Sequence, residues 1–137
     1  MGLVYTEITL KNATDDVQAR NGTIKEEEVR QATVKALVDT GTYTLVINEE
    51  LRERLGLDIF GPGYGTLANG TMGLYNRTGP LKITWKNRSI FFEALVIPNA
   101  KNVLLGALPL EALDLIINPN KEEVVGAHGE EMEYILC

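Results

Sequence analysis

The stretch from Val34 to Leu57, VKALVDTGTYTLVINEELRERLGL, decides the fold, because an acidic residue interrupts an otherwise apolar run. The apolar residues Ala36–Val38 lead directly into Asp39, and a second apolar segment, Leu45–Ile47, follows after a short turn. Placing a carboxylate in apolar surroundings costs on the order of several kcal/mol unless charges or hydrogen bonds compensate it. The local pattern fits two roles for Asp39: a turn residue that binds its own backbone, or an acid that does chemistry.

Length and composition are those of one ordinary globular domain. The chain has 137 residues, of which 45% are apolar and 23% are charged, so we expect a single domain over residues 1–137 with a substantial core. No apolar run is long enough to span a bilayer, and the start MGLVYTEITL lacks the basic and apolar regions of a signal peptide. These features predict a cytoplasmic protein without a membrane partner.

Charge and cysteine content argue against several other classes of protein. The chain has 13 basic and 19 acidic residues and a net charge of −6, which disfavours nucleic acid as a partner. Its single cysteine, Cys137, cannot form an internal disulfide and cannot build a zinc site by itself. We therefore expect neither a metal ion nor a cofactor.

Most of the chain is predicted to form short strands. Residues Leu3–Leu10 are rich in strand-forming residues, and Val29–Val38 becomes more apolar toward Asp39. One helix is well signalled, because Asn48 caps its start and Gly56 stops it. The other expected elements are a hairpin of Pro80–Trp85 and Ser89–Ile97, a strand at Val103–Gly106, a short helix at Leu108–Leu113, and closing strands at Leu115–Ile117, Val124–Val125 and Met132–Leu136.

Two segments interrupt this series of strands. Lys11–Glu28 is polar and contains Asn-Gly, so we expect a long hairpin or a partly mobile loop there. Phe60–Gly79 is rich in glycine, which predicts a hairpin or loop with its turn at Asn69-Gly70. This second segment fits a floppy connection and a functional cover for a cleft equally well. The elements together predict an all-β barrel with one or two short helices.

Several motifs follow one another in a specific order along the chain. ALVDTG is followed by a strand and LRERLGL, then by a glycine-rich segment that contains LANGT, and then by FFEALVIPNAKNVLLGALPLEALDLIINP. This order, over roughly residues 3–125, resembles the retropepsin-like aspartic protease family in its bacterial, single-domain form. The resemblance implies a retropepsin-like acid protease barrel that is homodimeric.

The resemblance assigns the catalytic motif to Asp39, Thr40 and Gly41. Asp39 matches the catalytic aspartate, Thr40 the residue whose hydroxyl bonds to the partner loop, and Gly41 the glycine that lets the chain turn sharply beside the acid. Members of the family need two aspartates, and this sequence contains Asp-Thr-Gly once. The resemblance therefore implies a homodimer in which one Asp39 from each subunit meets the other on the two-fold axis.

The resemblance also implies which residues border the substrate. The glycine-rich segment around Asn69 matches the flap that closes over a substrate, and Leu104–Gly106 matches an apolar-apolar-Gly element that packs beneath the active-site loop. Retroviral members usually have alanine where this chain has Thr42, whose hydroxyl is placed to donate a hydrogen bond to Asp39. The expected substrate-binding residues are Thr42, Ala68, Asn69, Gly70, Leu105 and Gly106.

The implied function is that of an aspartic endopeptidase, which cleaves a peptide or protein substrate with the Asp39 pair and an activated water. A competing function keeps the same dimeric barrel and uses the cleft only to bind extended peptides, without catalysis. Intact Asp39, Thr40 and Gly41 favour the enzyme. His128 lies in the polar stretch VGAHGEE, where we expect a solvated turn histidine without a catalytic role.

Overall fold

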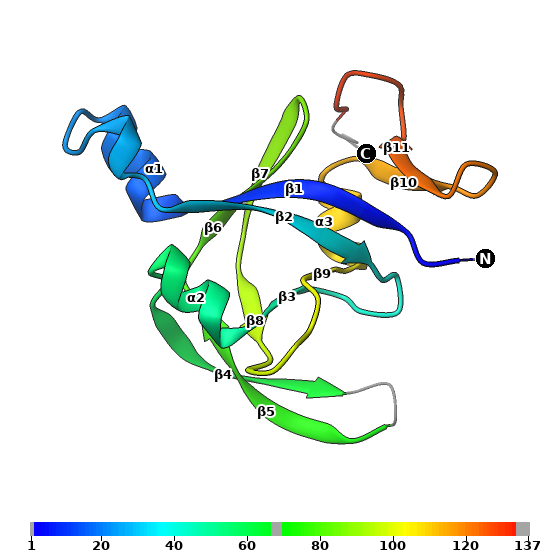
Figure 1. Ribbon diagram of the computed structural model, residues 1–137, viewed down its shortest axis with the longest axis horizontal. Helices are drawn as coiled ribbons and strands as arrows, with labels where there is room; N and C mark the ends of the chain where they lie inside the picture. Colours follow the sequence, from blue (N-terminus) through cyan, green and yellow to red (C-terminus); the bar gives the residue numbers. More distant parts are fainter. Residues whose placement is uncertain (1, 67–69, 134–137) are drawn as a thin grey trace.

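Strand pairing organises the molecule, and the computed structural model describes residues 2–66 and 70–133. Nine strands form one sheet in the order β4-β5-β8-β3-β9-β2-β1-β6-β7, and β10 pairs with β11 in a second sheet (Figure 1). The elements are β1 (Tyr5–Asn12), α1 (Ala13–Arg20), the 3-10 helix η1 (Glu26–Glu28), β2 (Gln31–Val38), β3 (Leu45–Ile47), α2 (Glu49–Leu55), β4 (Ile59–Thr66), β5 (Met72–Thr78), β6 (Leu81–Trp85), β7 (Arg88–Phe92), β8 (Ala94–Val96), β9 (Leu104–Leu105), α3 (Ala107–Ala112), β10 (Leu115–Asn118) and β11 (Glu123–Gly126).

Alternate residues of the central strands fill one apolar core. β1 pairs antiparallel with β2 along most of its length and with β6 at its end, so the three strands share a buried face. The large sheet and the short helices confirm the predicted all-β architecture. Fully or nearly fully buried core residues include Ile8, Leu10, Ala36, Leu45, Ile47, Leu81, Ile83, Leu105 and Leu113.

Helix α2 begins and ends where the sequence predicts. The side chain of Asn48 accepts a hydrogen bond from the backbone N–H of Leu51 at 2.8 Å, which caps the first turn. Gly56 follows the last turn with a φ of 63°, in the left-handed region that favours glycine. Leu51 and Leu55 lie on the buried face, so this local signal agrees with the tertiary structure.

The segment Lys11–Glu28 corrects one expectation, because it contains the helices α1 and η1 instead of a hairpin or loop. Asn12 caps α1 by accepting a hydrogen bond from the N–H of Asp15 at 3.0 Å. The carboxylate of Asp15 then binds the side chain of Arg30, with Nε to Oδ2 at 2.8 Å. Because α1 buries Ala13 and two aspartates in place of an apolar stripe, hydrophobic periodicity gives no signal for it.

One strand expectation is confirmed and another changes. The predicted hairpin in Phe60–Gly79 is formed by β4 and β5, which pair antiparallel in the β4–β5 hairpin with a register shift between Ile59 and Gly61. The expected strand Ser89–Ile97 is divided at Glu93: β7 pairs with β6, whereas β8 pairs with β3 and β5. Because of this division, one continuous segment contributes strands to two distant parts of the sheet. Local sequence does not predict it, because it depends on pairing with strands far away in the chain.

The C-terminal part closes the molecule on one side of the barrel. Helix α3 and the hairpin of β10 and β11 lie close to their expected positions. Met132 and Glu133 lie outside any strand, and the rest of the expected strand Met132–Leu136 is outside the described residues. None of the helices within the described ranges is long and apolar enough to cross a membrane.

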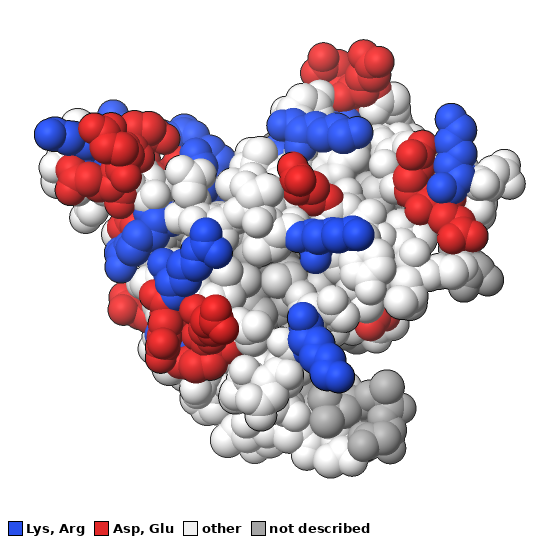
Figure 2. Space-filling view, viewed as in Figure 1, with Lys and Arg blue, Asp and Glu red and all other residues white. Residues whose placement is uncertain are grey.

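Charged side chains are unevenly distributed over the surface. In the view of Figure 2 they gather over α1 and α2, whereas the surface over the β4–β5 hairpin is mostly uncharged. This hairpin exposes several large apolar side chains: Phe60, Tyr64, Met72 and Leu74.

Candidate active site

Strand register separates two rows of side chains at the centre of the large sheet. Val38 pairs with Leu105, Leu105 with Leu45, and Leu45 with Ala94. All four residues are buried in the core. Because successive side chains on a strand point to opposite faces, the row next to this one must lie on the other face of the sheet.

The neighbouring row is also apolar. Leu37 pairs with Leu104, Leu104 with Val46, and Val46 with Leu95. We call these four residues the apolar row. Leu37, Leu104 and Leu95 are only half-buried, so the row supplies an accessible apolar surface on the face opposite the core.

Asp39 lies at one end of this surface. It follows Leu37 by two positions, and its N–H continues the strand ladder by donating to the carbonyl of Leu105 at 3.1 Å. Asp39 therefore has the same orientation as the apolar row, and it is half-buried. The strand that appears in the sequence to bury an acid instead delivers it to the opposite face.

The carboxylate of Asp39 is held by its own loop. Oδ1 accepts a hydrogen bond from the N–H of Gly41 at 3.0 Å, and Oδ2 accepts one from the hydroxyl of Thr42 at 3.0 Å. A carboxylate oxygen can accept further hydrogen bonds. The loop thus fixes the orientation of the acid and leaves acceptor capacity on both oxygens.

The loop after Asp39 is itself fixed by the start of α3. The N–H groups of Gly106, Ala107 and Leu108 donate to the carbonyls of Thr44, Thr42 and Tyr43, respectively, at 3.0, 2.7 and 2.9 Å. A Cβ at position 106 would collide with the backbone of this loop. Gly106 therefore permits a close approach of two backbones, and its contribution to the site is to position the loop.

Thr40 occupies a different environment from Asp39. It is exposed and lies at the edge of a groove of about 760 Å³. Leu108 and Ile116, which also line the groove, are exposed by 51% and 50%. A groove of mixed character thus begins beside the Asp-Thr-Gly motif and runs along α3, and its lining also includes the acidic residues Glu111, Asp114 and Glu133.

The expected substrate-binding residues fall into three groups. Thr42 contacts Asp39 directly, as expected. Leu105 is fully buried in the core, so the exposed side of β9 is carried by its neighbour Leu104. Gly70 lies in a turn with a φ of 85°, while Ala68 and Asn69 are outside the described residues.

Sequence reasoning missed the apolar row. Leu37 could have been found, because it is two residues from Asp39 on the same strand. Val46 and Leu95 carried no signal, because only the pairing of β3 with β8 brings them into register with Leu104.

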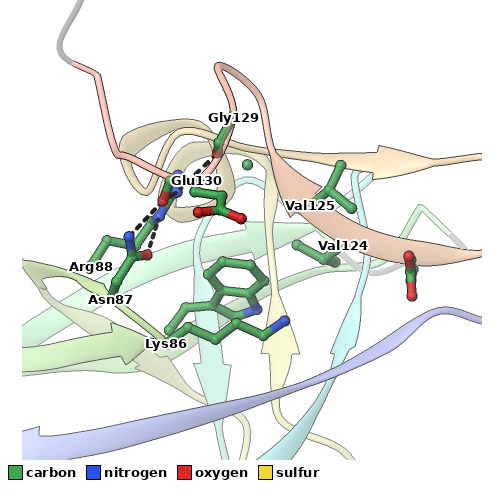
Figure 3. A pocket seen from close by; sticks show the side chains of 10 residues that line it. Lys86, Asn87, Arg88, Val124, Val125, Gly129 and Glu130 are labelled. Carbon is green, nitrogen blue, oxygen red and sulfur yellow. Dashed lines mark hydrogen bonds between the residues drawn. The ribbon is translucent and has the colours of Figure 1, made fainter.

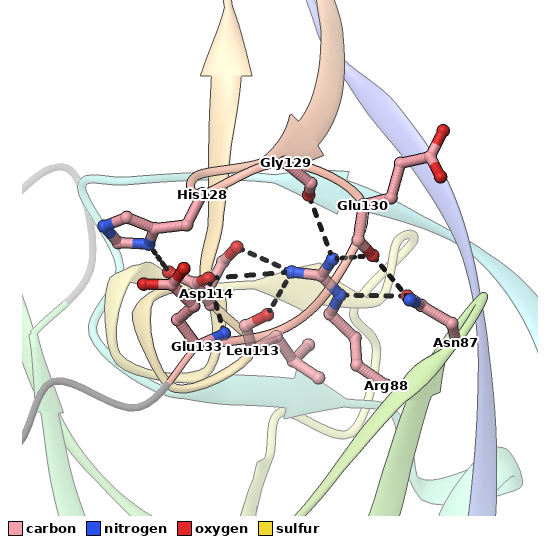
Figure 4. Close-up of polar contacts among 8 residues, drawn as sticks. All are labelled: Asn87, Arg88, Leu113, Asp114, His128, Gly129, Glu130 and Glu133. Atoms are coloured by element: carbon pink, nitrogen blue, oxygen red, sulfur yellow. Dashed lines mark hydrogen bonds and ion pairs between the residues drawn. The ribbon is translucent and has the colours of Figure 1, made fainter.

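A second polar cluster lies beneath the C-terminal segment (Figure 4). His128 is exposed and lies in a turn, as expected, and its Nδ1 also lies 2.7 Å from Asp114 Oδ1. Asp114 Oδ2 accepts the N–H of Glu133 at 3.0 Å. This hydrogen bond, with the one from His128, lowers the pKa of Asp114 below its usual value, against the opposing effect of burial.

Arg88 completes this cluster and is only 3% exposed. It also borders a cavity of about 530 Å³ above Trp85 (Figure 3), where the cations of Lys86 and Arg88 lie 4.7 and 5.4 Å from the indole centroid. Its guanidinium donates to protein acceptors and ties several segments together. The acceptors are the side chain of Asn87 and the carbonyls of Leu113, Asp114, Gly129 and Glu130.

Comparison with known proteins identifies the fold. A family profile described as Aspartyl protease matches residues 13–108, and no curated protein matches the chain. EIAV protease in complex with the inhibitor HBY-793 is 22% identical, with a TM-score of 0.58 over 82% of this chain and 88% of that one. The retroviral protease-like domain of Ddi1 from Leishmania major is 20% identical, with a TM-score of 0.58 over 91% and 88%.

Proposed function

The chain belongs to the aspartyl protease family in its retropepsin-like form, and from this premise we propose that it is an aspartic endopeptidase. The proposal is carried by one observation: the carboxylate of Asp39 is oriented by Gly41 and Thr42 on the same face as the apolar row. An acid held beside an accessible apolar surface suits hydrolysis of a peptide whose side chains pack on that surface.

The proposed active species is a homodimer. One Asp-Thr-Gly occurs in the sequence, and the proposed chemistry needs two carboxylates, so each subunit would contribute one Asp39. The exposed Thr40 and the groove beside it supply a surface on which the second copy would pack. The site is incomplete without that copy.

The proposed chemistry follows from two carboxylates that share one proton. The ionised Asp39 takes a proton from a water molecule while the water oxygen attacks the peptide carbonyl. The protonated Asp39 of the second copy donates a hydrogen bond to the developing oxyanion. The carbon–nitrogen bond then breaks as the nitrogen receives the proton that the first Asp39 took from the water, which restores the ionised state of that acid. Gly41 and Thr42 would hold the acid in position throughout the cycle.

The β4–β5 hairpin would act as the flap over this site. In Figure 1 the hairpin and the loop that joins β2 to β3 extend toward the same side of the molecule. A peptide bound between them in extended form would present alternate side chains to the apolar row below and to the hairpin above.

Cleavage of a mixture of synthetic peptides, read by mass spectrometry, tests the proposed function. The wild-type chain should cleave, and Asp39→Asn should not. Sedimentation of the same samples should show a dimer. A monomer that cleaves peptides would contradict the shared site, and a dimer that binds peptides without cleaving them would establish the peptide-binding module instead.

A further inference from the structure

The two faces of the β4–β5 hairpin differ sharply. Residues directly opposite each other in an antiparallel pair lie on the same face. One face carries the pairs Tyr64 with Leu74 and Thr66 with Met72. Tyr64 is 78% exposed, and Leu74 and Met72 are 59% and 67% exposed, so we call this the outer face.

The other face, which we call the inner face, is built largely from glycine. Gly65 pairs with Gly73, Gly63 with Tyr75, and Gly61 with Arg77. Tyr75 and Arg77 are therefore the only residues with side chains among these six paired positions. Both are half-buried, in contrast to the large side chains of the outer face.

The inner face is continuous with the apolar row. Arg77 pairs with Leu95, which places both side chains on the same side of the sheet. A Cβ at Gly63 or at Gly65 would lie 3.3 Å from a methyl carbon of Leu95. Because Asp39 shares the orientation of this row, the surface extends from Asp39 across β9, β3 and β8 to Tyr75.

The ring of Tyr75 occupies the space above Gly65 and Gly73, and the stem of Arg77 occupies the space above Gly63. A Cβ at Gly65 would lie 3.1 Å from Cδ2 of Tyr75, and a Cβ at Gly73 would lie 2.8 Å from its Cζ and its Oη. Gly73 precedes Tyr75 by two residues on β5, so the ring extends along the strand toward the turn, with its hydroxyl over Gly73. A side chain at either position would displace it.

We propose that Tyr75 is a specificity-determining residue that contacts a bulky apolar side chain of an extended peptide substrate. The proposal rests on the proposed protease function, in which an extended peptide would lie between the apolar row and the hairpin. The ring and Leu95 both border the space above Gly65, and Leu104 belongs to the same apolar row as Leu95. The other side chain of the inner face, Arg77, is already paired with an acid, because its Nη2 lies 3.0 Å from Glu93 Oε2.

The hydrogen bonds of the described residues do not include Tyr75 Oη. The hydroxyl is thus available to a substrate, while the ring supplies most of the contact area. The Tyr75→Phe variant should therefore preserve the preference for a bulky apolar side chain, and Tyr75→Ala should lose it.

Tyr64 provides a matched control, because it is the same residue type on the same hairpin and faces the opposite way. Peptides that differ at one position, with phenylalanine, leucine, valine or alanine next to the cleaved bond, are compared for wild type, Tyr75→Ala, Tyr75→Phe and Tyr64→Ala. Tyr75→Ala should reduce the ratio of kcat/KM for phenylalanine over alanine by about 10-fold, chiefly through KM. Tyr75→Phe and Tyr64→Ala should keep the wild-type ratio.

A merely structural tyrosine would lower kcat/KM equally for every peptide, and an unchanged ratio in Tyr75→Ala overturns the proposal. Gly73→Ala displaces the ring without removing it, so it should change the ratio in the same direction. Affinities of the phenylalanine and alanine peptides for Asp39→Asn, with and without Tyr75→Ala, separate this inference from the proposed function. Absence of cleavage by wild type refutes the function alone, whereas equal affinity ratios in the two variants refute the role of Tyr75.

Discussion

Asp39 and Asp114 are both turn aspartates with two hydrogen-bonded oxygens, yet their donors come from different places. Within residues 2–66 and 70–133, the donors to Asp39 are Gly41 and Thr42, both in its own loop. Asp114, at a φ of 56° and 7% exposed, accepts from His128 and Glu133, which are 14 and 19 residues away. Local donors orient a carboxylate and leave it open to a reactant, whereas distant donors use it to fasten segments together.

Arg88 extends the contrast. It is almost fully buried, and its guanidinium donates hydrogen bonds to the backbone carbonyls of Leu113, Asp114 and Glu130 (Figure 4). On the other side of the molecule, the glycines of the β4–β5 hairpin leave space over its inner face, where Tyr75 covers Gly65 and Gly73 but not Gly61. One region is held by many distant polar contacts and the other by few, so substitutions in the two regions should have different consequences.

The largest effect is expected at Asp39. Asp39→Asn removes the acid but preserves the shape of the side chain, so kcat/KM on a cleaved peptide should fall by about 1000-fold or more. The melting temperature should change little, because the donors of Asp39 are local. Asp114→Asn should show the opposite behaviour, with retained cleavage and a lower melting temperature. Equal losses of activity in the two variants would remove the distinction between the aspartates.

The next largest effect is expected at Arg88. Arg88→Met keeps much of the apolar stem but leaves buried carbonyls without donors, so the free energy of unfolding should fall by about 3 kcal/mol. Arg77→Met is the control, because Arg77 is 44% exposed and forms a surface ion pair with Glu93. Urea unfolding of the three proteins measures the difference. If Arg77→Met lowers the free energy of unfolding as much as Arg88→Met does, burial of the arginine does not determine how destabilising its removal is.

Acid should weaken the contribution of Asp114. Its pKa in the folded protein is lowered, first by the hydrogen bond from Glu133. The stabilisation is therefore fully present above the unfolded pKa of about 4 and is lost as pH falls through the lower folded value. The gap in melting temperature between wild type and Asp114→Asn should be widest at neutral pH and should narrow below about pH 4. A gap that widens in acid would contradict this assignment.

The smallest effect concerns Thr42. Its hydroxyl donates to Asp39 Oδ2 at 3.0 Å and helps to orient the carboxylate. Thr42→Ala removes one of the two orienting hydrogen bonds, so kcat/KM should fall by about 5-fold for a bond of ordinary strength. Thr44→Ala serves as the control, and an unchanged kcat/KM in Thr42→Ala would assign Thr42 to packing.

Local chemistry made part of the structure predictable. Asn48 and Gly56 mark the ends of α2 because a cap and a left-handed turn depend on residues close in sequence. The alternation of β1 and β2 predicts their core faces for the same reason. Helix α1 escaped prediction because its buried Asp15 is bound by Arg30 and its buried Asp16 lies near Lys82, and the approach of both cations depends on the fold.

The sequence by itself determined the strand that leads to Asp39, the Asp-Thr-Gly turn, the Thr42 hydroxyl and the family to which they point. Only the tertiary structure decided what surrounds them. The pairing of β3 with β8 and β9 aligns Val46, Leu95 and Leu104 beside Asp39, and the hairpin register puts Tyr75 over its glycines. The reason is physical: a turn is fixed by the residues within it, whereas strand register depends on contacts between segments far apart in the chain.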